Sequence, residues 1–170
     1  RAKDLTEQAR ILNELLRQID NGQEISLIGH SYGGPLIVKM ALEGPELFKN
    51  LVILAGALDP EAEKPEKWRK PLMWVPLKYV VPGALRPSND ELWWLKQDLK
   101  DMMPQLKDIS QHVLIIHGTE DKLVPYSNVP YMEKLFSNAA SMEVIRLENE
   151  NHFIVWTQDI LIKEALQKLP

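Results

Sequence analysis

Apolar positions along the chain follow two patterns, one helical and one continuous. In the first twenty residues they recur at the three- and four-residue spacings of one helical face, at Leu5, Ala9, Leu12, Leu16 and Ile19. Asn21-Gly22 then predicts the end of this helix, because glycine readily adopts the left-handed conformation of a helix cap. Short continuous apolar runs follow, and these predict buried strands at residues 25–28, 51–55, 113–116 and 142–147.

Helical segments alternate with the four predicted strands. They are expected at residues 35–42, 129–136 and 160–169, and Gly44-Pro45 stops the first of them. Buried strands separated by helices are typical of a parallel sheet that is covered on both faces. We therefore predict an α/β fold whose strands are parallel and adjacent in chain order, since such crossovers are right-handed and usually join neighbours.

The segment of residues 59–111 interrupts this alternation and is far longer than an ordinary crossover. It contains most of the prolines and four of the five tryptophans, namely Trp68, Trp74, Trp93 and Trp94. Ser88 and Glu91 have the spacing of a capping box, so a helix is expected to begin at Ser88. We predict a lid over a pocket, with a small satellite core as the alternative. The organisation is then core at 1–58, lid at 59–111 and core again at 112–170.

The first predicted strand leads directly into Gly29-His30-Ser31-Tyr32-Gly33, which fits the pattern G-x-S-x-G. A strand, a sharp turn and a helix are what a nucleophile elbow requires, because the turn lifts the serine Oγ above the sheet. Small residues are expected at positions 29 and 33, where neighbouring backbone should pass close to the turn. The helix that follows would direct its N-terminal N–H groups at the site. The alternative is a glycine-rich turn with a capping serine.

A serine nucleophile needs a general base that a third group holds in place. Glu120 and Asp121 follow the third predicted strand and are both candidates for the acid, while His152 follows the fourth strand. Both loops leave the carboxyl ends of their strands, where ligands bind in open α/β sheets. The chain order of serine, acid and histidine is that of an elbow-type triad.

The segments GHSYGG, HGTEDKLVP and NENHF resemble the three characteristic segments of the α/β-hydrolase fold superfamily, and the resemblance covers essentially the whole chain. It implies Ser31 as nucleophile, Asp121 rather than Glu120 as the acid, and His152 as the base. It also implies that the Tyr32 backbone N–H is an oxyanion donor. Structural roles are expected for His112 and His117, and His30 is expected to pack or hydrogen-bond below the serine as well as to lie at the pocket. The side chains that we assign to substrate contact are His30, Tyr32, Trp74, Trp93, Trp94, Val124 and Phe153.

The same resemblance implies a family sheet of eight strands in the order 1-2-4-3-5-6-7-8, and the four strands predicted here look like the last four. The chain also starts inside a predicted helix, without a methionine or a cap. In the family a second oxyanion donor comes from a loop after the third strand, for which this sequence has no counterpart. We expect the chain alone to turn over little ester, since one lost donor costs ~10²–10³ in rate. We expect the chain to pair with the missing upstream half of the fold or to form a homo-oligomer.

Charge and residue composition argue against several classes of function. The net charge is −4, which gives no reason to expect nucleic-acid binding, because phosphate contacts need clustered Lys and Arg. The absence of cysteine excludes disulfides and thiol chemistry and fits the cytoplasm. No apolar run approaches the ~20 residues that span a bilayer. Neither a metal nor an organic cofactor is needed by a triad of this kind.

These observations favour a serine hydrolase that cleaves a small, apolar carboxylic ester or a similar acyl bond. The same fold and triad also serve C–C bond hydrolases, amidases, lactonases and cofactor-free perhydrolases, so these reactions remain open. Relatives with an aspartate nucleophile are disfavoured, because Ser31 occupies that position. The alternative from another class is a binding module that retains the pocket without catalysis.

Overall fold

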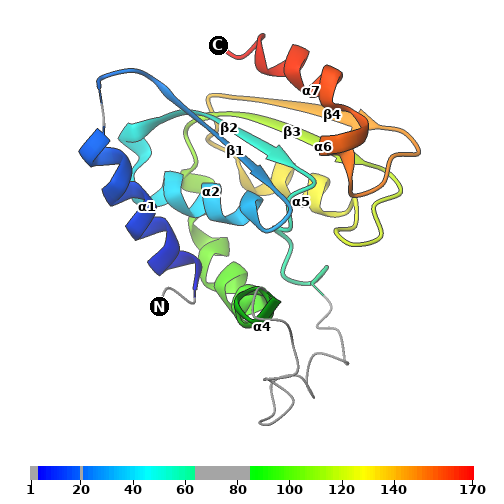
Figure 1. Ribbon diagram of the computed structural model, residues 1–170, viewed down its shortest axis with the longest axis horizontal. Coiled ribbons are helices and arrows are strands. Elements are labelled where there is room, and N and C mark those ends of the chain that lie inside the picture. Colours follow the sequence, from blue (N-terminus) through cyan, green and yellow to red (C-terminus); the bar gives the residue numbers. More distant parts are fainter. Residues whose placement is uncertain (1–3, 20, 64–84) are drawn as a thin grey trace.

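A single parallel sheet organises the chain in a computed structural model, which describes residues 4–19, 21–63 and 85–170, with the side chains of 85–93 excepted. The strands are β1 (Ile25–His30), β2 (Phe48–Leu54), β3 (His112–Gly118) and β4 (Ser141–Leu147), in the spatial order β1-β2-β3-β4 (Figure 1). Each neighbouring pair is parallel. The predicted α/β fold, with adjacent strands in chain order, is therefore confirmed.

The two central strands are buried on both faces, as their continuous apolar sequences require. On β2, Leu51 and Ile53 join one hydrophobic cluster, whereas Val52 and Leu54 join a second cluster on the opposite face. The outer strands β1 and β4 alternate instead mostly between half-buried and exposed positions, and each has a single buried residue near its carboxyl end. On β1 the side chain of Ile28 is 50% exposed, so the outer strand is only partly covered.

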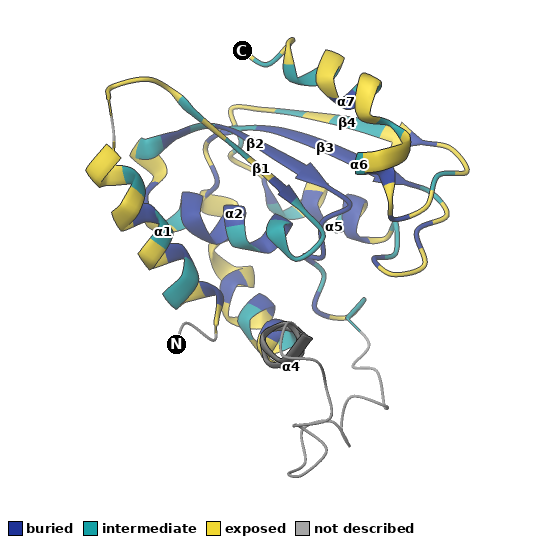
Figure 2. Cartoon of the chain, in the orientation of Figure 1, coloured by how far each residue is buried: buried dark blue, intermediate teal, exposed yellow. Residues whose placement is uncertain are grey.

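Helices cover the two faces unequally (Figures 1 and 2). One face carries four helices and a 3₁₀ segment: α1 (Leu5–Ile19), α2 (Gly33–Glu43), α4 (Leu85–Met102), η3 (Met103–Asp108) and α5 (Asn128–Leu135). Of the described helices, the other face carries only α6 (Ile154–Thr157) and α7 (Asp159–Leu166), while a short η1 (Pro45–Leu47) precedes β2. Among the described ranges, no helix combines the length and apolarity that crossing a bilayer would require.

Two helix boundaries differ from the sequence prediction. The helix α4 begins at Leu85, so Ser88 lies inside it and does not cap it. Pro87 falls in the first turn, where a missing backbone N–H costs nothing because that group has no intrahelical acceptor. The last predicted helix, at residues 160–169, corresponds to Asp159–Leu166 and ends earlier than expected; a separate short helix, which was not predicted, precedes it and is divided from it by the non-helical backbone of Gln158.

The second half of the segment 59–111 packs into the main core. Its buried apolar side chains are Leu95, Leu99, Met102, Leu106 and Ile109. The Asp98 carboxylate accepts a hydrogen bond of 3.1 Å from the Leu5 backbone N–H, which ties α4 to the start of α1. Trp68 and Trp74 lie outside the described residues, as does the side chain of Trp93. A lid above Ser31 therefore stays a prediction.

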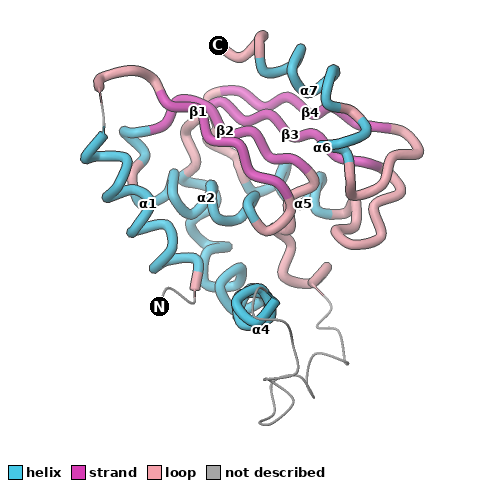
Figure 3. The backbone as a smooth tube through the Cα atoms, viewed as in Figure 1, coloured by secondary structure: helices cyan, strands magenta, loops and turns pink. Residues whose placement is uncertain are grey.

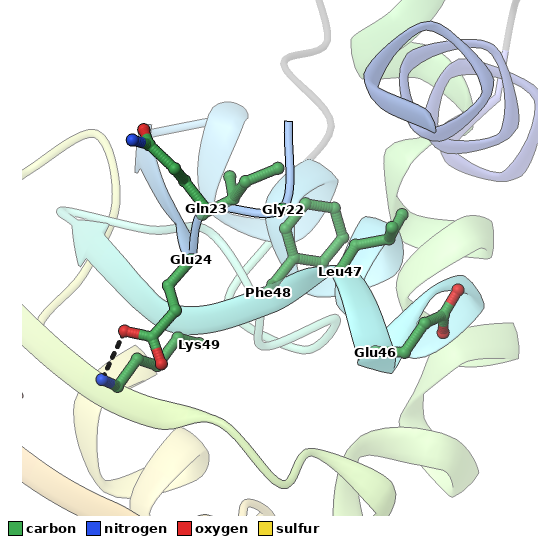
Figure 4. A pocket seen from close by; sticks show the side chains of 8 residues that line it. Gly22, Gln23, Glu24, Glu46, Leu47, Phe48 and Lys49 are labelled. Atoms are coloured by element: carbon green, nitrogen blue, oxygen red, sulfur yellow. Dashed lines mark hydrogen bonds and ion pairs between the residues drawn. The ribbon is translucent and has the colours of Figure 1, made fainter. Parts of the chain in front are cut away.

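A groove of about 390 Å³ lies at the amino ends of β1 and β2 (Figure 4). Its lining residues include the exposed ion pair of Glu24 and Lys49, whose Oε2 and Nζ atoms are 2.6 Å apart, and the ring of Phe48. The carboxyl ends of the strands, where His30 and the loops with Asp121 and His152 lie, form the opposite edge of the sheet (Figure 3). This groove is therefore separate from the candidate triad.

Asn128 joins the loop after β2 to the loop after β3. It is 1% exposed, and its Oδ1 accepts hydrogen bonds of 2.7 Å from the backbone N–H groups of both Leu58 and Asp59. Its Nδ2 donates to the Pro125 carbonyl at 2.9 Å. One buried amide thus fixes the separation of two loops at the edge of the sheet that carries the candidate site.

We predict that Asn128→Ala lowers the free energy of unfolding by about 2–4 kcal/mol, because it leaves two buried N–H groups without their acceptor. Denaturant unfolding followed by circular dichroism measures the change. Asn138→Ala is the matched control, since Asn138 is exposed and should change stability by less than about 0.5 kcal/mol. Equal stabilities of the two variants would contradict the assigned role of Asn128.

Candidate active site

Ser31 occupies a sharp turn between β1 and α2. Its φ angle is 54°, in the left-handed region that residues with a side chain rarely adopt. Backbone hydrogen bonds hold this conformation: Ser31 N–H donates to the Leu54 carbonyl at 2.9 Å, and Gly34 N–H donates to the Ser31 carbonyl at 3.0 Å. The strand, the strained turn and the helix therefore follow one another as a nucleophile elbow requires.

The glycines of this turn are not equally constrained. A Cβ on Gly29 would lie 2.2 Å from the Gly33 carbonyl oxygen, so only glycine fits that position. A Cβ on Gly33 would have no neighbour within 4 Å, which corrects the expectation that a small residue is needed there. The close approach falls instead on Gly34, whose Cβ would lie 2.9 Å from the Gly56 Cα. The G-x-S-x-G pattern could not show this, because it does not include the loop after β2.

Asp121 is buried in the loop after β3, and its two carboxylate oxygens have different partners. Oδ1 accepts hydrogen bonds from the backbone N–H groups of Leu123 at 2.9 Å and Val124 at 2.8 Å. Oδ2 is 2.7 Å from Nδ1 of His152, a distance typical of a charge-assisted hydrogen bond. The neighbouring Glu120 is exposed. The geometry therefore pairs Asp121, and not Glu120, with His152.

The charge of Asp121 is set by two opposing effects. Burial raises the pKa of its carboxyl group, but the hydrogen bonds from His152, Val124 and Leu123 outweigh it, so the pKa lies below the usual value. The carboxylate is thus ionised at neutral pH and can stabilise a proton on His152. No hydrogen bond joins Ser31 Oγ to His152 in the described part of the chain, and such bonds are often loose in free enzymes.

Backbone hydrogen bonds connect the acid loop to the histidine loop. Thr119 N–H donates to the Leu147 carbonyl at 2.9 Å, and Glu120 N–H donates to the Glu150 carbonyl at 2.9 Å. A Cβ on Gly118 would lie 2.3 Å from the Glu150 carbonyl oxygen, so the two loops are in direct backbone contact. Asp121 and His152 are therefore held by main-chain contacts as well as by their own hydrogen bond.

His117 lies under the acid loop and is fully buried. Its Nε2–H donates to the Val124 carbonyl at 2.9 Å, and the same atom is 3.6 Å from Oδ2 of Asp121. Burial lowers the pKa of this imidazole, although the Val124 carbonyl and the Asp121 carboxylate oppose that shift. His117 is therefore neutral in the folded protein. It binds the carbonyl of Val124, and the N–H of Val124 in turn donates to Asp121.

Aromatic side chains surround the backbone of His152. Nε2 of His30 is 3.0 Å from the His152 carbonyl oxygen, and the two imidazole rings are 4.8 Å apart between centroids. Trp156 packs edge-on against His30 at 5.9 Å, and Phe153 lies 5.9 Å from both Trp156 and His152. Trp156 was missed in the sequence analysis, which predicted no helix before residue 160, although it lies only four residues after His152.

The residues assigned to substrate contact lie in different surroundings. Phe153 is 53% exposed beside His152, whereas Val124 is buried and contributes its backbone to the acid loop. The Tyr32 hydroxyl accepts a hydrogen bond of 3.1 Å from Gln8 on α1. Trp94 is 48% exposed on α4, and no ring contact or hydrogen bond joins it to the triad within the described residues. Trp74, and the side chain of Trp93, lie outside them.

The described residues contain no group of three or more His, Asp or Glu side chains arranged to hold a metal ion.

Gly29→Ala is expected to lower the free energy of unfolding by about 3 kcal/mol, because the added methyl group would overlap backbone atoms that cannot move independently. Gly33→Ala is the matched control and should change stability by less than about 0.5 kcal/mol, since its Cβ would meet no neighbour. Thermal unfolding of both variants measures the difference. A Gly33 variant as unstable as the Gly29 variant would contradict this account of the elbow.

The buried His117 predicts a loss of stability on acidification. Because its folded-state pKa lies below the unfolded value near 6.5, the unfolded chain binds the proton first as the pH falls. At pH values under about 6.5, the free energy of unfolding should decrease by up to about 1.4 kcal/mol for each further pH unit. In His117→Gln the difference in unfolding free energy between about pH 7.5 and about pH 5.5 should be smaller than in the wild type. His112→Gln controls for the loss of a histidine, and an equal reduction there would refute the assignment.

Solved structures share this fold. The chain is 18% identical to an esterase from Exiguobacterium antarcticum, with a TM-score of 0.71, over 98% of this chain and 73% of that one. It is 16% identical to a lipase-esterase related protein from Clostridium acetobutylicum, with a TM-score of 0.74 and coverage of 99% and 76%. A monoacylglycerol lipase from Paleococcus ferrophilus gives 17% identity, a TM-score of 0.67 and coverage of 95% and 74%.

These identities are low enough that the likeness establishes the α/β-hydrolase fold alone. A search of curated proteins gave no significant match. The sequence itself matches the prolyl oligopeptidase family over residues 1–168, which is nearly the whole chain. The protein therefore belongs to the prolyl oligopeptidase family of α/β-fold serine hydrolases.

Proposed function

We propose that this hydrolase cleaves a carboxylic ester or a similar acyl bond, with Ser31 as nucleophile, His152 as general base and Asp121 as the orienting acid. The observation that carries the proposal is the 2.7 Å hydrogen bond between Asp121 Oδ2 and His152 Nδ1, in loops at the same sheet edge as the strained Ser31 turn. A proton on Nδ1 leaves Nε2 as the acceptor for the Ser31 hydroxyl proton.

The reaction then follows in two steps. Ser31 Oγ attacks the acyl carbon while His152 Nε2 takes the hydroxyl proton, and His152 returns that proton to the departing alkoxide. Water next attacks the acyl-enzyme with His152 again as base, which releases the carboxylic acid and restores Ser31. The backbone N–H of Tyr32, at the N-terminal end of α2, is the proposed donor to the oxyanion.

Exposed apolar side chains support an apolar substrate. Leu123 of the acid loop is 61% exposed, and Phe153 and Trp156 beside His152 are 53% and 68% exposed. Apolar groups around a charged pair favour an uncharged acyl or alcohol portion, because burying both surfaces removes apolar area from water. The Leu123 backbone also holds Asp121, so this side chain is fixed close to the chemistry.

Peptide hydrolysis is the second candidate, and the family match favours it. Amide and ester cleavage use the same triad and differ in the leaving group, since an amine is a poorer leaving group than an alkoxide and departs only once His152 has protonated it. Comparing a p-nitrophenyl ester with the matching p-nitroanilide distinguishes the two. Turnover of the anilide at a rate similar to that of the ester would favour the peptidase assignment.

Covalent labelling by a fluorophosphonate probe tests the nucleophile, because the probe reacts only with an activated serine. In the full-length enzyme the wild type should be labelled at Ser31, and Ser31→Ala should lose the label and reduce ester turnover by roughly 10⁴-fold or more.

Ser137→Ala is the matched control, since Ser137 is exposed after α5 and should retain both activities. An unlabelled wild type with native circular dichroism, or labelling that survives Ser31→Ala, would overturn the proposal and favour a binding module.

A further inference from the structure

The histidine loop has a long distance to cover. Its strand, β4, is the outermost strand on one side of the sheet, and β1, which ends at the nucleophile, is the outermost strand on the other side. Three strand spacings separate them, about 14 Å in total. His152 must therefore reach back across the ends of β3 and β2 to meet Ser31, and any freedom at the far end of this loop would change the distance between base and nucleophile.

Two side chains hold His152 from opposite directions. Asp121 binds the imidazole through Nδ1 at 2.7 Å, which sets the orientation of the ring. His30 binds the backbone carbonyl of the same residue at 3.0 Å, which sets the position of the chain. Since a carbonyl oxygen only accepts, His30 Nε2 carries the proton in this contact. The His30 bond therefore joins the elbow directly to the backbone of the histidine loop.

The ring of His30 is itself supported. Trp156, on α6, stands edge-on to it at 5.9 Å, and Phe153 packs against Trp156. His30 is half-buried at the end of β1 and immediately precedes Ser31 in the chain. The bond to the His152 carbonyl therefore starts one residue from the nucleophile and ends on the backbone of the base.

We infer that His30 is a positioning residue that sets the separation of Ser31 and His152 by anchoring the histidine loop to the nucleophile elbow. The inference rests on the proposed function, because it assigns to His30 a role in the same triad. It differs from a purely structural role, since the contact fixes one catalytic group relative to another. The donor at Nε2 should therefore matter more than the volume of the side chain.

The matched variants are His30→Gln and His30→Met, which have similar length and volume and differ in the presence of an N–H donor. His30→Gln should keep the second-order rate of fluorophosphonate labelling within about threefold of the wild type. His30→Met should reduce it by ~10–100-fold, as a displacement of about 1 Å can. The loss should appear in kcat rather than in KM. His112→Gln and His112→Met control for replacing a histidine by glutamine or methionine, and the two should react with the probe at the same rate.

A spectroscopic measurement separates this inference from the proposed function. The proton on Nδ1 of His152, shared with Asp121, should give a strongly deshielded NMR signal in the wild type and in His30→Gln. In His30→Met that signal should shift or broaden. This readout decides the positioning role even if the wild type fails to label, which would refute the proposed function alone. An unchanged His152 signal in His30→Met, or equal labelling rates for the two His30 variants, would overturn the inference.

Discussion

Hydrogen bonds between four parallel strands determine where every candidate catalytic group lies. Because all the strands run in the same direction, the turn at Ser31, the loop of Asp121 and the loop of His152 leave the sheet at one edge. The strand register pairs Leu54 with His30 and Leu147 with Gly118, so the loops begin at matching positions along neighbouring strands. The contacts between loops then only have to refine positions that the register has already brought within reach.

The parts of the fold that depend on local pattern were predictable from the sequence. Continuous apolar runs identified the strands, because burial on both faces of a sheet leaves little choice of residue. Helix ends were less predictable: the capping-box spacing at Ser88 was outweighed by a helix that begins at Leu85. The contact between His30 and the His152 carbonyl joins residues 122 positions apart, so no local pattern could have indicated it. The same holds for Gly34, whose constraint comes from Gly56.

The candidate site divides its tasks between backbone and side chains. Main-chain hydrogen bonds and glycine contacts hold the acid and histidine loops together, so their geometry depends little on the residues exposed on them. The exposed Leu123 contributes only its backbone N–H to the acid loop, so its side chain is free to differ without moving the triad, whereas Phe153 and Trp156 also pack around His152 and His30. Chemistry and selectivity can thus be altered separately, as is common where function lies in loops on a rigid scaffold.

The two oxygens of the Asp121 carboxylate restrict how loop lengths can change in this protein. One oxygen closes the turn through Leu123 and Val124, and the other binds His152. Asp121 therefore holds the acid loop in its own conformation and also joins it to the histidine loop. An insertion or deletion between Asp121 and Val124 would preserve one set of contacts only by breaking the other. A change of chain length should therefore be tolerated better in connections outside this turn, such as the crossover between β2 and β3.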